Sequence, residues 1–177
     1  MINNYALETR TLYLAKRLNK IMSLRKKYQL AAAEWNKQNN FTLFGSCLFN
    51  YESTLSKSDR VKAMKRFWNA IDRKIYTKKE VVVEGKRVER LVYVEEGRGR
   101  DFIHFHFFCK AETPKQLKQI INASQHFWNK NVNDTQILDL KLNQRNDDRS
   151  GYGVKEFSSI SNEQILTECC HLKQTHP

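Results

Sequence analysis

The run Ile103–Cys109 has the sequence Ile-His-Phe-His-Phe-Phe-Cys, in which bulky apolar residues alternate with two histidines. Side chains alternate between the two faces of a β-strand, so a strand here turns Phe105 and its apolar neighbours toward a core. His104 and His106 then lie together on the other face, and neutral imidazole is a common metal ligand. The run therefore predicts a sheet, with either a metal site or two solvated histidines on its second face.

The rest of the chain predicts an α+β fold. Apolar residues recur at helical spacing in three segments: 5–38, the segment from about Ser58, and the segment from Thr113. Strand patterns are found in four segments, of which the second is a hairpin turning near Gly85: 41–50, 80–96, 103–109 and 136–143. Tight turns join the middle strands, so we expect a central five-stranded antiparallel sheet flanked by helices.

The charge of the chain predicts an anionic partner. Lysine and arginine number 31 against 19 acidic residues, which gives a formal net charge of +12. Such an excess is typical of proteins that bind nucleic acid. In the N-terminal helix, Lys16, Arg17 and Lys20 are candidates for DNA phosphate contacts, and a solvated helix face is the alternative.

The cysteines favour a reducing compartment. The four residues Cys47, Cys109, Cys169 and Cys170 form no C-x-x-C motif and no disulfide framework. The sequence shows no apolar run of membrane-spanning length and no secretory signal. We therefore expect a cytoplasmic protein without a membrane partner.

A third metal ligand is expected from the strand that precedes the histidines. That strand ends with Glu95 and Glu96, and the turn Gly97–Arg100 brings it alongside the histidine strand. Strand alternation directs only one of these carboxylates toward the imidazoles. Two histidines and one carboxylate suit Mg²⁺ or Mn²⁺ and also Zn²⁺ or Fe²⁺, so the ligands alone leave a phosphodiester enzyme, a hydrolase and an iron oxygenase open.

The net charge favours phosphodiester chemistry, for which the segment Gly151–Phe157 offers a nucleophile. Tyr152 and Lys155 lie three positions apart and share a face if this segment is helical. A phenol has a pKa of about 10, so a nearby cation such as Lys155 would help it to ionise. The alternative is a packed tyrosine beside a solvated lysine.

Three motifs in order resemble those of the HUH endonucleases, the rolling-circle replication initiator (Rep) proteins of small viruses, phages and plasmids. The first motif is FTLFGSC, the second is EEGRGRDFIHFHFF, and the third is YGVKEF, which has the spacing Y-x-x-K. The similarity covers residues 41–157. It implies an endonuclease domain over residues 40–177 with an RRM-like sheet, preceded by a basic helical extension over residues 1–39.

The resemblance implies a site and a reaction. His104, His106 and Glu96, with Glu95 as the alternative, would hold Mg²⁺ or Mn²⁺. Tyr152 would attack a phosphodiester in single-stranded DNA, or in an origin hairpin, and stay joined to the 5′ phosphate, as in the single-tyrosine class, with Lys155 assisting. Arg98 and Arg100, in the turn before the histidine strand, are further candidates for DNA contact.

The expected function is therefore DNA nicking and strand transfer that starts rolling-circle replication. The sequence contains no G-x-x-x-x-G-K-[ST] helicase motif, so a helicase and a polymerase of a prokaryotic host are expected partners. Two alternatives stay open. One is a non-catalytic protein that binds single-stranded nucleic acid, and the other is a transposase or relaxase that uses the same chemistry.

Overall fold

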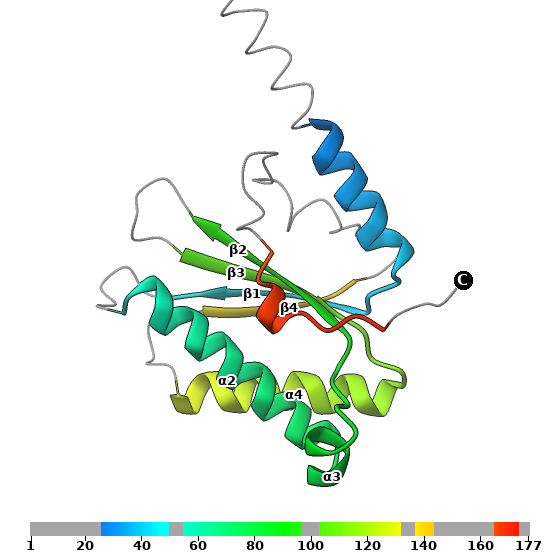
Figure 1. The fold of residues 1–177 in the computed structure, drawn as a ribbon, viewed down its shortest axis with the longest axis vertical. Helices are drawn as coiled ribbons and strands as arrows, with labels where there is room; N and C mark the ends of the chain where they lie inside the picture. Colours follow the sequence, from blue (N-terminus) through cyan, green and yellow to red (C-terminus); the bar gives the residue numbers. More distant parts are fainter. Residues whose placement is uncertain (1–25, 50–54, 97–102, 132–136, 144–164, 174–177) are drawn as a thin grey trace, which may run out of the picture.

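The computed structural model describes residues 26–49, 55–96, 103–131, 137–143 and 165–173 (Figure 1). These residues form an α+β fold in which helices flank one antiparallel sheet. The strands are β1 (Leu43–Leu48), β2 (Arg90–Glu96), β3 (Ile103–Cys109) and β4 (Ile137–Leu142). Their order across the sheet is β2-β3-β1-β4, which places the histidine strand β3 at an interior position.

The predicted count of five strands is wrong for the described part of the chain, where the sheet has four. The first half of the expected hairpin is instead helix α3 (Lys78–Val82). The Thr77 hydroxyl accepts the backbone N–H of Glu80, and the Glu80 carboxylate accepts the backbone N–H of Thr77. This capping box stabilises a helix start and outweighs the strand preference of the three valines that follow.

Two long helices cover the face of the sheet that carries the core residues of β3. They are α2 (Lys57–Ile75) and α4 (Pro114–Asn131), close to the helices expected from about Ser58 and from Thr113. The Thr113 hydroxyl accepts the backbone N–H of Gln116, which fixes the start of α4. Phe67 and Trp68 of α2 pack against the ring of Phe107 with centroid separations of 5.9 and 4.9 Å.

Strand β1 approaches the histidine strand closely at Gly45. Gly45 is paired with Phe107, and a Cβ atom at Gly45 would overlap the Phe107 ring. A glycine inside a strand often marks a bulge or a close backbone approach, and the structure shows a close approach here. Because Gly45 has no side chain, β1 can pack directly against the Phe107 ring. Ser46 is the next residue of β1.

A further helix lies on the opposite face of the sheet (Figure 1). Residues 26–38 are helical, and Ala32 and Ala33 pack against an aromatic cluster that includes Phe44 and Phe108. The Tyr93 hydroxyl donates a hydrogen bond to Oδ1 of Asn36 at 3.0 Å. The helix thus covers the Phe108 end of this face and leaves the end with His104 and Glu95 beyond it.

The C-terminal segment closes the outer edge of the sheet. Arg90 exchanges backbone hydrogen bonds with His171, and Ile165 forms a bridge to Tyr93. The short 3₁₀ helix η2 (Thr167–Cys169) lies between these two contacts. Covering the edge of β2 satisfies backbone groups that would otherwise be open to another chain.

A buried ion pair connects this edge to the helical layer. The Asp72 carboxylate accepts hydrogen bonds from the Arg90 guanidinium at 2.9 and 3.1 Å and from the backbone N–H of Val88 at 2.9 Å. Arg90 also donates from Nε to the carbonyl of Cys169. Asp72 and Arg90 therefore hold α2, β2 and the C-terminal segment together.

None of the helices in the described residues is long and apolar enough to span a membrane.

Candidate functional site

The two histidines lie on the same face of β3, as the alternation predicts. Phe105 and Phe107 are fully buried against the helical layer, whereas His104 is half-buried on the opposite face. His106 is only 4% exposed, and the ring of Phe44 stacks on its imidazole at a centroid distance of 5.8 Å. His106 is therefore tightly packed, whereas His104 is more exposed to solvent.

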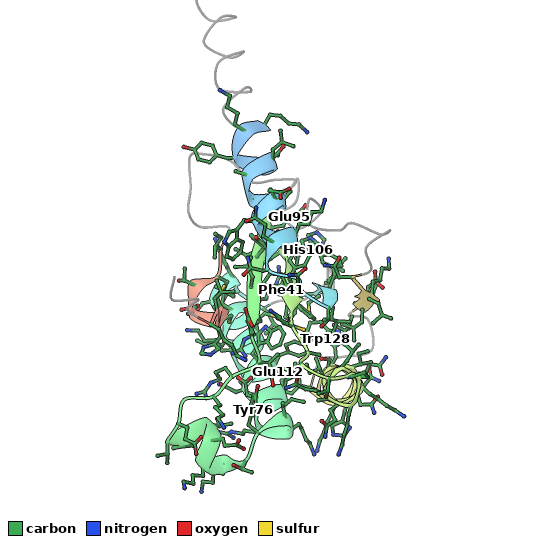
Figure 2. The ribbon with its side chains drawn as sticks, turned by 90° about the vertical axis from the view of Figure 1, so that its right-hand side faces the viewer. Phe41, Tyr76, Glu95, His106, Glu112 and Trp128 are labelled. Atoms are coloured by element: carbon green, nitrogen blue, oxygen red, sulfur yellow. The ribbon has the colours of Figure 1, made fainter. Side chains whose placement is uncertain are left out.

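His106 is held between a hydroxyl and a carboxylate on its two neighbouring strands. Its Nδ1 atom lies 2.9 Å from Oγ of Ser46 on β1, and its Nε2 atom lies 2.9 Å from Oε2 of Glu95 on β2. Figure 2 shows Glu95 and His106 close together, apart from Tyr76 and Trp128 of the helical layer. Contacts at both ring nitrogens fix the orientation of the imidazole.

The strand register separates the two candidate carboxylates. Glu95 is paired with His104, while Glu96 is paired with Ile103. Glu95 therefore lies directly across from one histidine and contacts the other on the diagonal, and its side chain is 12% exposed. This register brings Glu95, the alternative in the sequence analysis, to the imidazoles.

The histidines open onto a hollow of about 460 Å³ on this face of the sheet. Ser46, Glu95 and both histidines line it, and Asp139 of β4 faces it from the far side. The Asp139 carboxylate accepts a hydrogen bond from Nζ of Lys141 at 2.9 Å. The sequence analysis missed Ser46 and Asp139, because both reach the site only through the pairing of β1 with β3 and β4.

The chain of contacts from Ser46 through His106 to Glu95 has the order of a serine hydrolase triad. Its surroundings do not suit that chemistry. Ser46 is 7% exposed and lies on a central strand that pairs with β3 on one side and β4 on the other. In such a strand the backbone N–H groups are engaged in the ladder, so those beside Ser46 do not provide a pair of donors for an oxyanion.

The same atoms fit two ligands of a hard cation. Adjacent ligands of an octahedral Mg²⁺, each about 2.1 Å from the ion, lie about 3.0 Å apart. The Nε2 atom of His106 and the Oε2 atom of Glu95 are 2.9 Å apart. With Nε2 on the cation, Nδ1 would carry the ring proton and donate it to Ser46, an arrangement common among histidine ligands.

A third ligand side chain does not lie beside His106 and Glu95 in the described residues. Among the described residues, no three His, Cys, Asp or Glu side chains already surround one point. His104 lines the same hollow and lies opposite Glu95, so it is the candidate for the third ligand. The donor set of two imidazoles and one carboxylate suits Mg²⁺ or Mn²⁺ and also Zn²⁺ or Fe²⁺, with other positions left for water or substrate.

Tyr93 is the one tyrosine of β2, and it is paired with His106. Its hydroxyl donates to Asn36, and burial raises the pKa of the Tyr93 phenol well above its usual value. A phenol that is this hard to ionise is a poor nucleophile. Tyr93 therefore contributes to packing beside the site.

The other predicted site residues lie outside the described residues: Lys16, Arg17, Lys20, Arg98, Arg100, Tyr152 and Lys155. The described chain does define both ends of the segment that contains Tyr152. Asn143 donates from Nδ2 to the carbonyl of Phe41 beside β4, and Ile165 pairs with Tyr93 on β2. These two ends lie at opposite edges of the sheet.

Comparison of the chain with family models, curated proteins and solved structures finds no match. The likeness to HUH endonucleases consequently rests on the three sequence motifs.

Proposed function

We propose that this chain is a metal-dependent endonuclease that nicks single-stranded DNA and remains joined to the cut strand. The observation that carries this proposal is the contact between Glu95 and His106, with His104 lining the same hollow. Two imidazoles and a carboxylate on a rigid sheet are a suitable set for Mg²⁺ or Mn²⁺. The formal net charge of +12 suits a polyanionic substrate.

The residues have distinct roles in the proposed reaction. His104, His106 and Glu95 would hold the ion, which when bound withdraws charge from a phosphodiester oxygen. The Tyr152 hydroxyl gives up its proton to solvent water, and its oxygen forms a bond to phosphorus. The bond from phosphorus to the 3′ oxygen breaks, and that oxygen takes a proton from solvent and leaves as a 3′ hydroxyl. Lys155 favours the phenolate by its positive charge.

One end of the segment that contains Tyr152 is held beside the candidate site, which is compatible with Tyr152 as the nucleophile. Asn143 and Ile165 are both held against the sheet that carries the histidines. Ile165 also packs on the aromatic cluster of the histidine face. The segment that contains Tyr152 and Lys155 thus starts beside β4 and ends beside β2, where Tyr93, the partner of Ile165, is paired with His106.

The free 3′ hydroxyl left by such a cut can prime DNA synthesis. We therefore propose that the reaction initiates rolling-circle replication of a phage, plasmid or small viral replicon. A helicase and a polymerase of the host would then extend the new strand. A transposase or relaxase of the same chemistry would differ in its DNA target.

A non-catalytic protein that binds single strands is less well supported. Such proteins stack bases on aromatic residues exposed on a sheet. Here Phe105 and Phe107 are fully buried, and Phe44 and Phe108 are covered by the helix over residues 26–38. The described sheet therefore offers no open aromatic platform in the positions where that function needs one.

A nicking assay tests the proposal. Labelled single-stranded oligonucleotides that tile the intergenic region of the replicon are incubated with Mn²⁺, with and without EDTA. We expect cleavage by the wild type that EDTA abolishes and that His106→Ala lacks. His171→Ala is the matched control, because His171 lies at the C-terminal edge, and it should cleave normally. Tight binding of these oligonucleotides without cleavage of any of them would refute the proposed endonuclease activity.

A further inference from the structure

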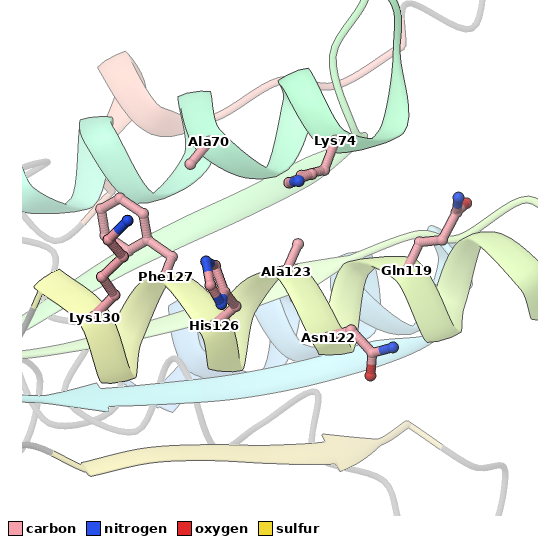
Figure 3. A pocket seen from close by; sticks show the side chains of 8 residues that line it. All are labelled: Ala70, Lys74, Gln119, Asn122, Ala123, His126, Phe127 and Lys130. Carbon is pink, nitrogen blue, oxygen red and sulfur yellow. The ribbon is translucent and has the colours of Figure 1, made fainter.

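A groove of about 550 Å³ lies between α2 and α4, in the helical layer (Figure 3). Ala70 of α2 and Ala123 of α4 both point into the space between the two helices. Two small side chains at facing positions leave space that larger residues would fill. We call this hollow the α2–α4 groove.

The α2–α4 groove is lined with cations and lacks acidic side chains. Lys74 lines it from α2, and Lys130 lines it from α4. Neither lysine forms an ion pair within the part of the chain that the structure describes. Helix α4 contains no Asp or Glu at all. An anion in this groove would meet two lysines without competition from a described carboxylate.

The remaining lining groups suit a base as well as a phosphate. Gln119 and Asn122 are exposed amides that both donate and accept hydrogen bonds. Phe127 is half-buried, and Phe67 packs edge-on against it at a centroid distance of 5.7 Å. This contact holds the Phe127 ring in place, so a planar base could pack against it at little cost in side-chain entropy.

These features together fit a nucleotide better than an acidic peptide. A nucleotide needs cations for phosphate, amides for the edges of its base and an apolar surface for the ring. A run of carboxylates would use the lysines alone. The volume of the groove also lies in the range of about 300–1,000 Å³ that is usual for small-ligand sites.

The groove is separate from the candidate metal centre. Helices α2 and α4 pack on the face of the sheet that carries Phe105 and Phe107, and the histidines lie on the other face. A strand in the groove therefore leaves the histidine face of the sheet uncovered. We propose that the α2–α4 groove is a second binding site for single-stranded nucleic acid, with phosphates at Lys74 and Lys130 and a base against Phe127.

The groove site does not depend on the proposed nicking activity, so it is tested by binding in EDTA. A fluorescein-labelled oligothymidylate is titrated with protein at several salt concentrations, and anisotropy reports the affinity. The double variant Lys74→Gln/Lys130→Gln is compared with Lys78→Gln/Lys79→Gln on α3. Both variants lose the same charge from exposed helix positions, and thermal unfolding shows whether each is folded.

We expect the groove variant to bind several-fold more weakly than the wild type and the α3 control. Loss of two phosphate contacts should lower the slope of log affinity against log salt by about 1.4 in magnitude for a single strand. Oligonucleotides that carry 5-iodouracil should crosslink to a peptide that contains Phe127. Nicking assayed in parallel shows whether the metal centre works, whatever the outcome at the groove.

Three results would overturn the groove site. Equal losses in the two double variants would show that only the overall charge matters. Crosslinks confined to peptides outside α2 and α4 would place the strand elsewhere. Binding of a polyglutamate peptide that depends on Lys74 and Lys130, with oligothymidylate binding unchanged, would assign the groove to an acidic protein segment.

Discussion

Glu95 contacts His106 on the diagonal of the β2–β3 ladder, with Oε2 and Nε2 2.9 Å apart, while its own partner in register is His104. One carboxylate thus contacts the imidazole of His106 and lies across the ladder from His104. Glu95 of β2 on one side and Ser46 of β1 on the other hold His106 from two neighbouring strands. Sites built on strands are held more precisely than sites on loops, which suits a metal centre.

Replacing each glutamate in turn separates the two candidate ligands. Glu95→Gln keeps the shape of the side chain and removes the charge, so the affinity for Mn²⁺ should fall at least about tenfold. Glu96→Gln, at the position paired with Ile103, should leave the affinity nearly unchanged. Isothermal titration with Mn²⁺ measures both variants. A loss confined to Glu96→Gln would assign the ligand to Glu96.

Ser46 should act as a positioning residue for His106. Ser46→Ala removes the hydroxyl beside Nδ1, and we expect the affinity for Mn²⁺ to fall by about 10–100-fold without loss of folding. Ser124→Ala is the matched control, since Ser124 is buried in α4 and its hydroxyl has no hydrogen-bond partner among the described residues. Equal Mn²⁺ affinities for the two variants would remove Ser46 from the site.

The buried pair of Asp72 and Arg90 should matter for stability rather than for chemistry. Asp72→Asn leaves the Arg90 guanidinium buried with no opposite charge from Asp72, so the free energy of unfolding should fall by about 3–5 kcal/mol. Urea denaturation followed by circular dichroism measures the change. The exposed pair of Asp59 and Lys62 is the comparison, and Asp59→Asn should shift the urea midpoint far less. Similar shifts would show that burial does not distinguish the two pairs.

A side chain at Gly45 should disturb the core beneath the candidate site. Gly45→Ala forces the Phe107 ring away from β1, and we expect a loss of about 1–3 kcal/mol in the free energy of unfolding. Phe107→Leu makes room and should recover part of that loss in the double variant. A double-mutant cycle by urea denaturation measures the coupling. If the losses of unfolding free energy in the two single variants simply add in the double variant, the contact between position 45 and the Phe107 ring is contradicted.

Much of the architecture could be predicted from local sequence patterns. Alternation placed both histidines on one face of a strand, and helical spacing located α2 and α4. The segment at residues 80–83 misled the prediction because three consecutive valines favour a strand. The reciprocal hydrogen bonds of Thr77 and Glu80 start a helix there instead.

The details of the candidate site depend on strand register, which alternation alone does not determine. A shift of one residue between β2 and β3 would have presented Glu96 to the histidines in place of Glu95. Ser46 and Asp139 come from strands distant in sequence, and only the ladders of β1 place them beside the hollow. A sequence pattern could identify them as candidates only after the pairing was known.

The most direct test of the proposed mechanism is a search for the covalent adduct. The wild type is incubated with Mn²⁺ and an oligonucleotide that it cleaves, denatured, and digested for mass spectrometry. We predict a denaturant-resistant protein–DNA adduct on the peptide that contains Tyr152, absent with EDTA and from Tyr152→Phe, and retained by the control Tyr28→Phe. Cleavage without any adduct, or an adduct that persists in Tyr152→Phe, would contradict the mechanism.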